Sequence, residues 1–523
     1  MSSPRIAPPT GTPDVRRPRT SGVPPFATVP VAIPAFVAGV VFLLRVDRYG
    51  HFGDELYFLA AGRHLAAGYV DQGPVVAVIA RAVDLLAPGS LVVLRTPAVL
   101  ATVTAIVITA AVAREFGGDT RAQVLAALAY ATSPFALSQA ASLSTFALDS
   151  TCSALVVWLL VRWTRIRDDR LIPVAFCAAA LDLQIKWLAI VVLIGLAAGI
   201  ASLGPRDLLR NRVFWVSGAG AAVTVLPAIV WQAGHGWPQW AMGEAIRAEQ
   251  QLATGGRAAL LGHQFVQAGA LGSILLAAAT AGFLRYEGLR RYRFVAVAAA
   301  VALLFVFVTA TRPYYTAAVL PAVFAAGAVA VTASSWRWWR RLHLGLGAVS
   351  AVIALAAVVA LPRPADSLRE PSDSATQVYS RMRIYGTSGW PELTVTVTGA
   401  YRALPADVAR RTVIVTDSYW QASGLEHFAG EELPPIYSPN RGYAYFGRPP
   451  DATGNVLYVG PWRGGTGLCA HFRTATAVAA ADDPLGFPGI SRSVTVALCT
   501  EPLRPWHEIW TRTETLALDM GVA

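Results

Sequence analysis

The sequence D-R-Y-G-H-F-G-D-E-L-Y-F-L-A-A-G-R-H-L-A-A-G-Y-V-D-Q-G-P, from Asp47 to Pro74, follows directly after the first long apolar run of the chain. It places two adjacent carboxylates, Asp54 and Glu55, at the mouth of a predicted membrane helix. An amphipathic segment and a G-Y-V-D-Q turn come next. Because ionisable side chains are costly at a bilayer, this pair indicates a functional site. We interpret the pair as a candidate site at the surface of an integral membrane protein.

The composition of the whole chain supports a membrane protein. Of 523 residues, 54% are hydrophobic and only 14% are charged, whereas soluble domains carry about 25% charged residues. Many apolar runs reach the length of roughly 18 residues that crosses a hydrocarbon core. The predicted class is therefore a polytopic α-helical membrane protein followed by a C-terminal soluble α/β domain.

The hydropathy pattern predicts about eleven membrane spans. The fifth predicted span is short and can form a broken hairpin with the sixth. The predicted spans are 29–46, 91–113, 122–140, 145–162, 171–184, 186–203, 213–231, 260–284, 294–310, 314–333 and 343–361.

The distribution of arginine predicts the orientation. Alternate loops are rich in arginine, for example 162–170, 206–212 and 285–293, and such loops stay in the cytoplasm. The N-terminus is therefore predicted to be cytoplasmic and the C-terminal domain extracytoplasmic, in a multi-pass protein of the plasma membrane. The net charge of +11 is explained by these loops, and no nucleic-acid-binding module accompanies it.

Three parts of the chain are predicted from composition. Residues 1–28 are rich in Pro, Ser and Arg and read as a disordered cytoplasmic tail. Residues 29–361 form the transmembrane domain, with an external loop at 47–90. Residues 362–523 contain alternating segments such as T-V-I-V-T-D (412–417) and N-V-L-Y-V (455–459), which are typical of short strands.

Cysteine usage agrees with this organisation. Cys469 and Cys499 lie on apparent strands of the C-terminal domain, and an oxidising compartment would let them form a disulfide. Two cysteines without a C-x-x-C spacing make a poor metal site.

Asp54 and Glu55 have two interpretations. Either carboxylate can take a proton from an acceptor hydroxyl or amine, or hold a divalent cation against a phosphate. Alternatively, the pair caps the N-terminus of a helix. No metal-ligand cluster is evident, so a divalent cation stays one option and no cofactor is assigned.

Cationic residues on the same side of the membrane are candidates for a phosphate site. Lys186 is the only lysine in the chain and lies inside an apolar segment, where it either pairs with a lipid phosphate or reaches the interface. Arg312 can bind a phosphate through two hydrogen bonds, and Tyr314 and Tyr315 follow it. Further candidates for contacts with the phosphate or the substrate are Arg63, Arg95, Gln72, Asp149 and His235.

Together these motifs resemble those of the protein O-mannosyltransferase and aminoarabinose-transferase superfamily, which are family 39-like glycosyltransferases with the GT-C fold. The resemblance spans roughly residues 40–330 and keeps the motif order. It rests on the following motifs: the acidic pair with Y-x-x-x-A-x-x-x-x-A-x-G-Y-V-D-Q-G-P, L-R-T-P-A-V-L (94–100), L-Q-I-K-W (183–187), W-Q-x-G-H-G-W-P (231–238) and R-P-Y-Y-T-A-A-V-L-P-A-V-F-A-A-G (312–327). One departure is Gly73, which stands where the family commonly has the first of two prolines.

The resemblance implies transfer of a sugar from a polyprenyl-phosphate donor, on the external face, to an acceptor that is a protein, a polysaccharide or a lipid. It implies that Asp54 is the catalytic carboxylate, and that Lys186, Arg312, Tyr314 and Tyr315 bind the donor phosphate.

Two other functions remain open from the sequence. A lipid or solute transporter is one, although transporters often carry internal repeats and none is found in this sequence. An inactive scaffold that binds cell-wall material is the other; loss of the acidic pair would have favoured it.

Overall fold

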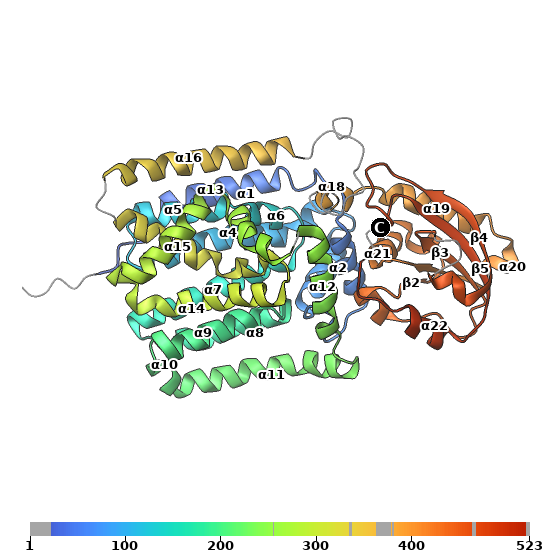
Figure 1. The fold of residues 1–523 in the computed structure, drawn as a ribbon, viewed down its shortest axis with the longest axis horizontal. Helices are drawn as coiled ribbons and strands as arrows, with labels where there is room; N and C mark the ends of the chain where they lie inside the picture. Colours follow the sequence, from blue (N-terminus) through green and yellow to red (C-terminus); the bar gives the residue numbers. More distant parts are fainter. Residues whose placement is uncertain are drawn as a thin grey trace, which may run out of the picture.

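The computed structural model describes residues 22–254, 256–333, 337–361, 378, 381–462 and 467–518. Of the predicted tail 1–28, all but the last seven residues lie outside the described residues. A bundle of long helices makes up one part of the molecule, and an α/β domain caps one end of it (Figure 1). The predicted division into a helical domain and a C-terminal α/β domain matches this arrangement.

The bundle follows the predicted apolar runs closely. Six helical stretches among the described residues are long and apolar enough to cross a membrane, and four shorter apolar helices accompany them. The polytopic class is therefore confirmed, while the count of eleven spans stays a prediction. The bundle helices are α1 (Thr28–Leu43), α4 (Leu91–Glu115), α5 (Thr120–Ala131), α6 (Pro134–Gln139), α7 (Thr145–Ile166), α8 (Leu171–Ile185), α9 (Ala189–Leu203), α10 (Asp207–Arg210), α11 (Arg212–Gly234), α13 (Arg257–Arg285), η1 (Glu287–Tyr292), α14 (Arg293–Thr309), η2 (Pro313–Val319), α15 (Leu320–Ala333) and α16 (Arg337–Ala360).

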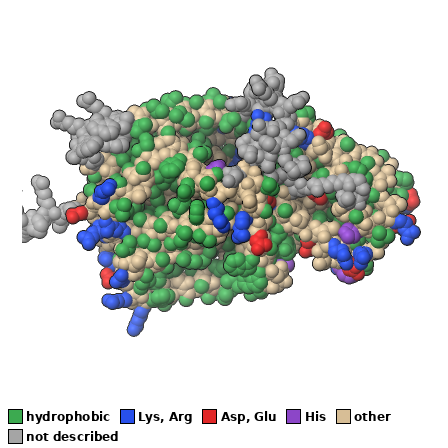
Figure 2. Space-filling model, viewed as in Figure 1, with side chains coloured by type: hydrophobic (Ala, Val, Ile, Leu, Met, Phe, Trp, Pro, Cys, Tyr) green, Lys and Arg blue, Asp and Glu red, His purple; other side chains and the backbone are tan. Residues whose placement is uncertain are grey.

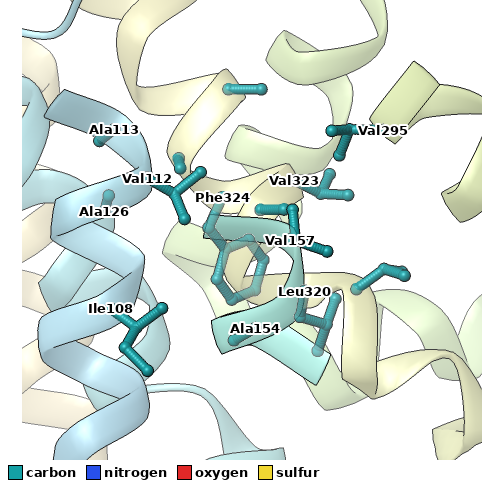
Figure 3. Close-up of a cluster of buried hydrophobic side chains, with 14 of the residues drawn as sticks. Ile108, Val112, Ala113, Ala126, Ala154, Val157, Val295, Leu320, Val323 and Phe324 are labelled. Atoms are coloured by element: carbon teal, nitrogen blue, oxygen red, sulfur yellow. The ribbon is translucent and has the colours of Figure 1, made fainter. Parts of the chain in front are cut away.

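Helix α15 is the centre of the bundle. Phe324 on this helix is fully buried and lies among aliphatic side chains of α4 and α7, including Val112 and Val157 (Figure 3). Small residues let the neighbouring helices approach closely. A Cβ atom on Gly327 would lie 2.1 Å from the carbonyl oxygen of Leu275 on α13. Such close approach compensates for the weak hydrophobic drive between helices in lipid.

The end of the bundle away from the α/β domain is basic, and Figure 2 shows basic side chains gathered there, all of them arginines because the one lysine lies at the other end. Glu115, at the end of α4, is fully buried beneath them. Its carboxylate pairs with Arg114 at 3.0 Å, Arg162 at 3.1 Å and Arg165 at 2.6 Å. The arginines predicted to set the orientation therefore also tie α4 to α7.

Three helices lie at the capped end, outside the bundle. Loop 47–90 contains α2 (Gly53–Arg63) and α3 (Val75–Leu86), and α12 (Pro238–Thr254) follows α11. Most residues of α2 are buried, because the helix lies between the bundle and the α/β domain (Figure 1). The first turn of α2 carries the acidic pair.

The α/β domain contains one five-stranded sheet of order β2-β1-β3-β5-β4. Strands β2, β1 and β3 are parallel, whereas β5 is antiparallel to both β3 and β4. The two predicted strands are β1 and β3. The elements of the domain are α18 (Met382–Tyr385), α19 (Trp390–Arg402), α20 (Ala406–Ala409), β1 (Thr412–Thr416), α21 (Tyr419–Ala429), η4 (Gly430–Glu432), β2 (Ile436–Tyr437), η5 (Arg441–Phe446), β3 (Asn455–Gly460), η6 (Gly467–His471), β4 (Phe472–Ala481), β5 (Val494–Pro502) and α22 (Trp506–Thr513).

The predicted disulfide is confirmed. Cys469 on η6 and Cys499 on β5 are bonded, with their Cα atoms 5.9 Å apart. Both residues belong to the buried cluster beneath α22, so the bond joins η6 to the sheet.

Candidate active site

A cavity of about 110 Å³ lies where the mouth of the bundle meets the α/β domain. Its wall combines α2, the break after α8, α12, η2 and the first turns of α21 and η5. Six residues predicted from the sequence line it: Asp54, Gln72, Lys186, Arg312, Tyr314 and Tyr315. The other lining residues are Tyr57, Phe58, Asp71, Thr145, Phe146, Met242, Ile246, Tyr419, Arg441 and Gly442.

Asp54 is held by the α/β domain. The Tyr419 hydroxyl donates to Asp54 Oδ1 at 2.7 Å, and Trp420 Nε1 donates to the same oxygen at 2.9 Å. Both donors belong to the first turn of α21, which begins at the N-cap residue Ser418. Two hydrogen bonds on Oδ1 fix the plane of the carboxylate and leave Oδ2 as the oxygen available to a substrate.

A missing side chain makes this contact possible. A Cβ atom on Gly53 would lie 2.0 Å from the Trp420 ring. The indole therefore packs directly on the backbone of the first turn of α2. Phe52, the N-cap of that helix, also meets the Trp420 ring edge-on, with centroids 5.1 Å apart.

Lys186 lies in the break between α8 and α9, so the apolar segment predicted there is a broken helical hairpin. Its Nζ pairs with Asp71 Oδ2 at 2.7 Å and lies 5.3 Å from the centre of the Phe146 ring. A β-bridge joins Gln72 to Lys186. Gly73 fits against α8 because a Cβ atom there would lie 2.1 Å from the Gln184 carbonyl oxygen, which explains the missing proline at this position.

Gln72 brings an unpaired donor to the cavity. Its side chain is 1% exposed, and its Nε2 has no hydrogen-bond partner among the described residues. A buried amide donor without a partner is costly. A substrate oxygen in the cavity would satisfy it.

Two arginines from different domains meet at one carboxylate. Arg312, at the start of η2, pairs with Glu249 Oε2 at 2.8 Å, and Arg441, at the start of η5, pairs with Glu249 Oε1. The Leu518 N–H also donates to Glu249 Oε1 at 3.0 Å. Burial alone would raise the pKa of Glu249, but the two guanidinium groups lower it below its usual value. The carboxylate is therefore ionised at neutral pH.

Two tyrosines of the cavity stay protonated. Burial, and then nearby carboxylates, raise the pKa of Tyr57 and of Tyr419 well above the usual value. Tyr419 is thus a hydrogen-bond donor to Asp54 at any physiological pH. The Tyr57 hydroxyl is buried and has no hydrogen-bond partner among the described residues.

Glu55 and Arg95 do not line the cavity, which corrects the prediction that they act in catalysis and phosphate binding. Arg95 Nη2 lies 2.7 Å from Glu55 Oε2, and its Nε lies 2.8 Å from Oε1. The Glu55 side chain is fully buried, and that of Arg95 is 1% exposed. Arg95 also donates to carbonyl oxygens of residues 46, 49 and 50. The pair therefore holds the start of loop 47–90 on α4.

Three other candidates also lie away from the cavity. Arg63 pairs with Asp84 at 3.6 Å and with Glu426 at 3.3 Å, on the outer side of α2. His235 is exposed and stacks on Trp231, with ring centroids 4.2 Å apart. Asp149 is buried within α7. None of the three is among the described residues that line the cavity.

The sequence did not point to the contributions of Asp71, Glu249, Tyr419, Trp420 and Arg441. Asp71 stood within the quoted turn, but the others lie in segments with no recognised motif. A buried ion pair between distant parts of the chain leaves no local signal. Among the described residues, no group of three or more His, Cys, Asp or Glu side chains is arranged to hold a metal ion.

Comparison with known proteins identifies the fold. Residues 71–231 match the model of the dolichyl-phosphate-mannose-protein mannosyltransferase family. The crystal structure of ArnT from Cupriavidus metallidurans bound to undecaprenyl phosphate is similar, with a TM-score of 0.50 and 18% identity, over 77% of this chain and 75% of that chain. The protein has the GT-C fold. No curated protein sequence matches it.

Two further GT-C structures are similar over part of their length. The arabinofuranosyltransferase AftD from Mycobacteria gives a TM-score of 0.49 at 16% identity, over 93% of this chain and 40% of that chain. The oligosaccharyltransferase AglB from Archaeoglobus fulgidus, in complex with an inhibitory peptide and a dolichol-phosphate, gives 0.46 at 14% identity, over 77% and 63%.

Proposed function

We propose that the protein transfers a sugar from a polyprenyl-phosphate-linked donor to an acceptor on the external face of the plasma membrane. One observation carries the proposal: the Asp54 carboxylate shares a single cavity with the cationic groups of Lys186 and Arg312. A transferase that expels a phosphate needs both, namely a base for the acceptor and positive charge for the leaving group.

The chemistry assigns a task to each residue. An acceptor hydroxyl or amine attacks the anomeric carbon of the sugar, and Asp54 Oδ2 takes its proton. The bond between that carbon and the phosphate oxygen breaks, and the polyprenyl phosphate leaves with the bonding electrons. Lys186 and Arg312 stabilise the charge that develops on the phosphate. The Tyr419 and Trp420 donors orient the carboxylate throughout.

The comparisons support the substrate class. The matched family model is that of transferases named for a dolichyl-phosphate-linked sugar, and the ArnT structure with the same fold is bound to undecaprenyl phosphate. Both names describe a long isoprenoid chain with a phosphate head. A site at the mouth of a helical bundle suits such a donor, because its chain can stay in lipid while its head reaches the cavity.

The experiment that tests the proposal is a transfer assay in membranes that contain the wild-type protein or the Asp54→Asn variant. Radiolabelled polyprenyl-phosphate sugars are supplied, and label is followed into acceptor fractions. We expect transfer by the wild type and a loss of at least about a hundredfold in the variant, which is the usual contribution of a general base. Asp47→Asn is the matched control, since Asp47 is exposed at the start of the same loop.

Two outcomes would contradict the proposal. Equal transfer by the wild type and Asp54→Asn would remove Asp54 from the reaction. An absence of transfer from any polyprenyl-phosphate sugar, with the protein folded in the membrane, would reject the donor class. The divalent cation stays a prediction from the sequence, tested in the same assay by adding EDTA and then restoring Mg²⁺ or Mn²⁺.

A further inference from the structure

The group formed by Arg312, Glu249 and Arg441 is unusual in its charge balance. Two guanidinium groups, on side chains that are 11% and 14% exposed, share one carboxylate that is 7% exposed. The three side chains therefore form a mostly buried charged cluster beside the cavity, and Asp54 adds negative charge near Arg441. Because burying charge is expensive, such an arrangement is rarely an efficient way to stabilise a fold. Because both arginines also line a cavity, their convergence is better explained by an anion that binds there.

The three residues lie beside the cavity that contains Asp54. Arg312 and Arg441 both line it. Helix α12 forms one of its walls through Met242 and Ile246, and Glu249 follows on the same helical face at the i+3 spacing. Glu249 thus reaches the two arginines from a helix that lies across the mouth of the bundle (Figure 1).

A carboxylate and a phosphate make similar demands on arginine. Each presents two oxygen atoms to guanidinium N–H groups in a planar, charge-assisted arrangement. In this structure one Glu249 oxygen faces Arg312 and the other faces Arg441. A phosphate group between the same two arginines would receive the same pair of contacts.

We propose that Arg312 and Arg441 together form the binding site for the phosphate of the lipid-linked donor, and that Glu249 occupies this site as a substitute anion until the donor displaces it. The inference rests on the proposed function and deepens it. It makes Arg441, a residue of the α/β domain, part of the donor site. It also makes donor binding a competition with a carboxylate of the protein itself.

The competition predicts the direction in which the affinity for the donor changes when Glu249 is substituted. A ligand that must displace an internal anion binds more weakly than its contacts alone would allow, because part of the interaction is spent on the exchange. Removing the charge of Glu249 should therefore strengthen donor binding. A residue that only clamps the two domains together predicts the opposite, since its loss would loosen the cavity.

The experiment measures binding of radiolabelled undecaprenyl phosphate to the purified full-length protein in detergent, by scintillation proximity. Unlabelled undecaprenol, which lacks the phosphate, serves as a competitor that reports on the isoprenoid chain alone. We expect Glu249→Gln to bind undecaprenyl phosphate about tenfold more tightly, and Arg441→Gln about tenfold more weakly, the scale of one charge-assisted interaction. Undecaprenol competition should be unchanged in both variants.

Matched controls separate this effect from a general change of charge. Glu432→Gln and Arg448→Gln change exposed ion-paired residues of the same domain and should leave the affinity at the wild-type value. Monodisperse elution and an unchanged thermal midpoint confirm that a variant is folded. If Glu249→Gln does not fold, Arg441→Gln alone decides.

The outcomes are distinguishable from failure of the proposed function. If Glu249→Gln binds as the wild type does or more weakly, or if Arg441→Gln keeps the wild-type affinity, the composite site is wrong although the donor class stands. Undecaprenyl phosphate is the leaving group of the proposed reaction and carries the phosphate and the chain of the donor. If the wild type does not prefer it over undecaprenol, the lipid-phosphate donor class is rejected, and the composite site is rejected with it.

Discussion

At the scale of single residues, the acidic pair shows that two neighbouring residues of a helix can have different roles because they point in different directions. Asp54 and Glu55 are neighbours in the sequence, but successive helical residues point about 100° apart. Asp54 therefore lines the cavity, while Glu55 turns inward to the fully buried pair with Arg95. The sequence could predict the site from this pair, and helical geometry dictates that only one of the two carboxylates faces it.

The donors to Asp54 give the first prediction. Trp420→Phe removes one N–H from Asp54 and keeps an aromatic ring, and Tyr419→Phe removes one hydroxyl. A hydrogen bond to a charged group contributes about 1.5–3 kcal/mol, so each variant should lower kcat by about tenfold or more. The KM for the donor should change little, because the donors orient a carboxylate that takes the acceptor proton. Steady-state transfer kinetics provide the measurement.

Trp506→Phe is the matched control for that prediction. It removes an indole N–H that donates to a carbonyl oxygen in the same domain, at 3.1 Å from Thr453, far from the cavity in sequence and outside its lining. A kcat as low in this variant as in Trp420→Phe would mean that domain stability, and not the orientation of Asp54, explains the effect.

Gly53 gives the second prediction. In Gly53→Ala the new methyl group would overlap the Trp420 ring, since its Cβ would lie 2.0 Å from the ring. Overpacking of this kind costs about 1–3 kcal/mol, and it would push Trp420 away from Asp54. Both the thermal midpoint and the transfer rate should fall. Gly399→Ala, on the open side of α19 with no atom within 4 Å of its Cβ, should lower neither.

At the scale of elements, apolar runs predicted the helices well, because a helix that crosses the hydrocarbon core must be long and apolar. The break at Lys186 was also predictable, since a lone lysine in an apolar run must end or bend a span to find a partner. The positions of helices α2 and α12 were harder to predict from the sequence, because their burial depends on a domain that comes far later in the chain. Arg63 lies away from the cavity for the same reason, since its partner Glu426 belongs to that later domain. Arg95 lies away from it because it pairs with Glu55 of the acidic pair, a pairing that no sequence pattern indicated.

The contact between loop 47–90 and α21 gives the third prediction, which concerns pH. The His51 and His427 rings lie 4.7 Å apart at this contact. Burial, and then the neighbouring His427, lower the pKa of His51 from 6.5 to about 4. Between these values the unfolded chain binds more protons than the folded one, so stability falls as the pH decreases. His51 alone contributes about 3 kcal/mol that is fully present above pH 6.5 and lost toward pH 4.

Thermal midpoints of the purified protein between pH 7.5 and 4 provide the measurement for His51. The His51→Phe variant keeps a ring beside His427 and should show a flatter pH dependence than the wild type. His507→Phe, at an exposed position, should not change the slope. Identical slopes for the wild type and His51→Phe would show that His51 does not control acid stability.

At the scale of the whole molecule, the site belongs to neither domain alone. The bundle supplies Lys186 and Arg312, the loop supplies Asp54, and the α/β domain supplies Tyr419, Trp420 and Arg441. Local motifs predicted the first three, because each is an ionisable residue at a membrane surface. The last three could not be predicted, since 365 residues separate Tyr419 from Asp54 and only the folded chain brings them together. The α/β domain was predicted as a unit, but not as a wall of the cavity.

The orientation of the molecule gives the last prediction. The basic loops at one end of the bundle predict that this end is cytoplasmic, so the α/β domain and the cavity should face outward. Alkaline phosphatase fused after residue 518 should be active and a fluorescent protein fused there should be dark. The same reporters fused after residue 168, in a basic loop, should give the reverse. If both results were inverted, the cavity would open to the cytoplasm, where its disulfide-bonded cap is not expected to form, and the external acceptor would have to be abandoned.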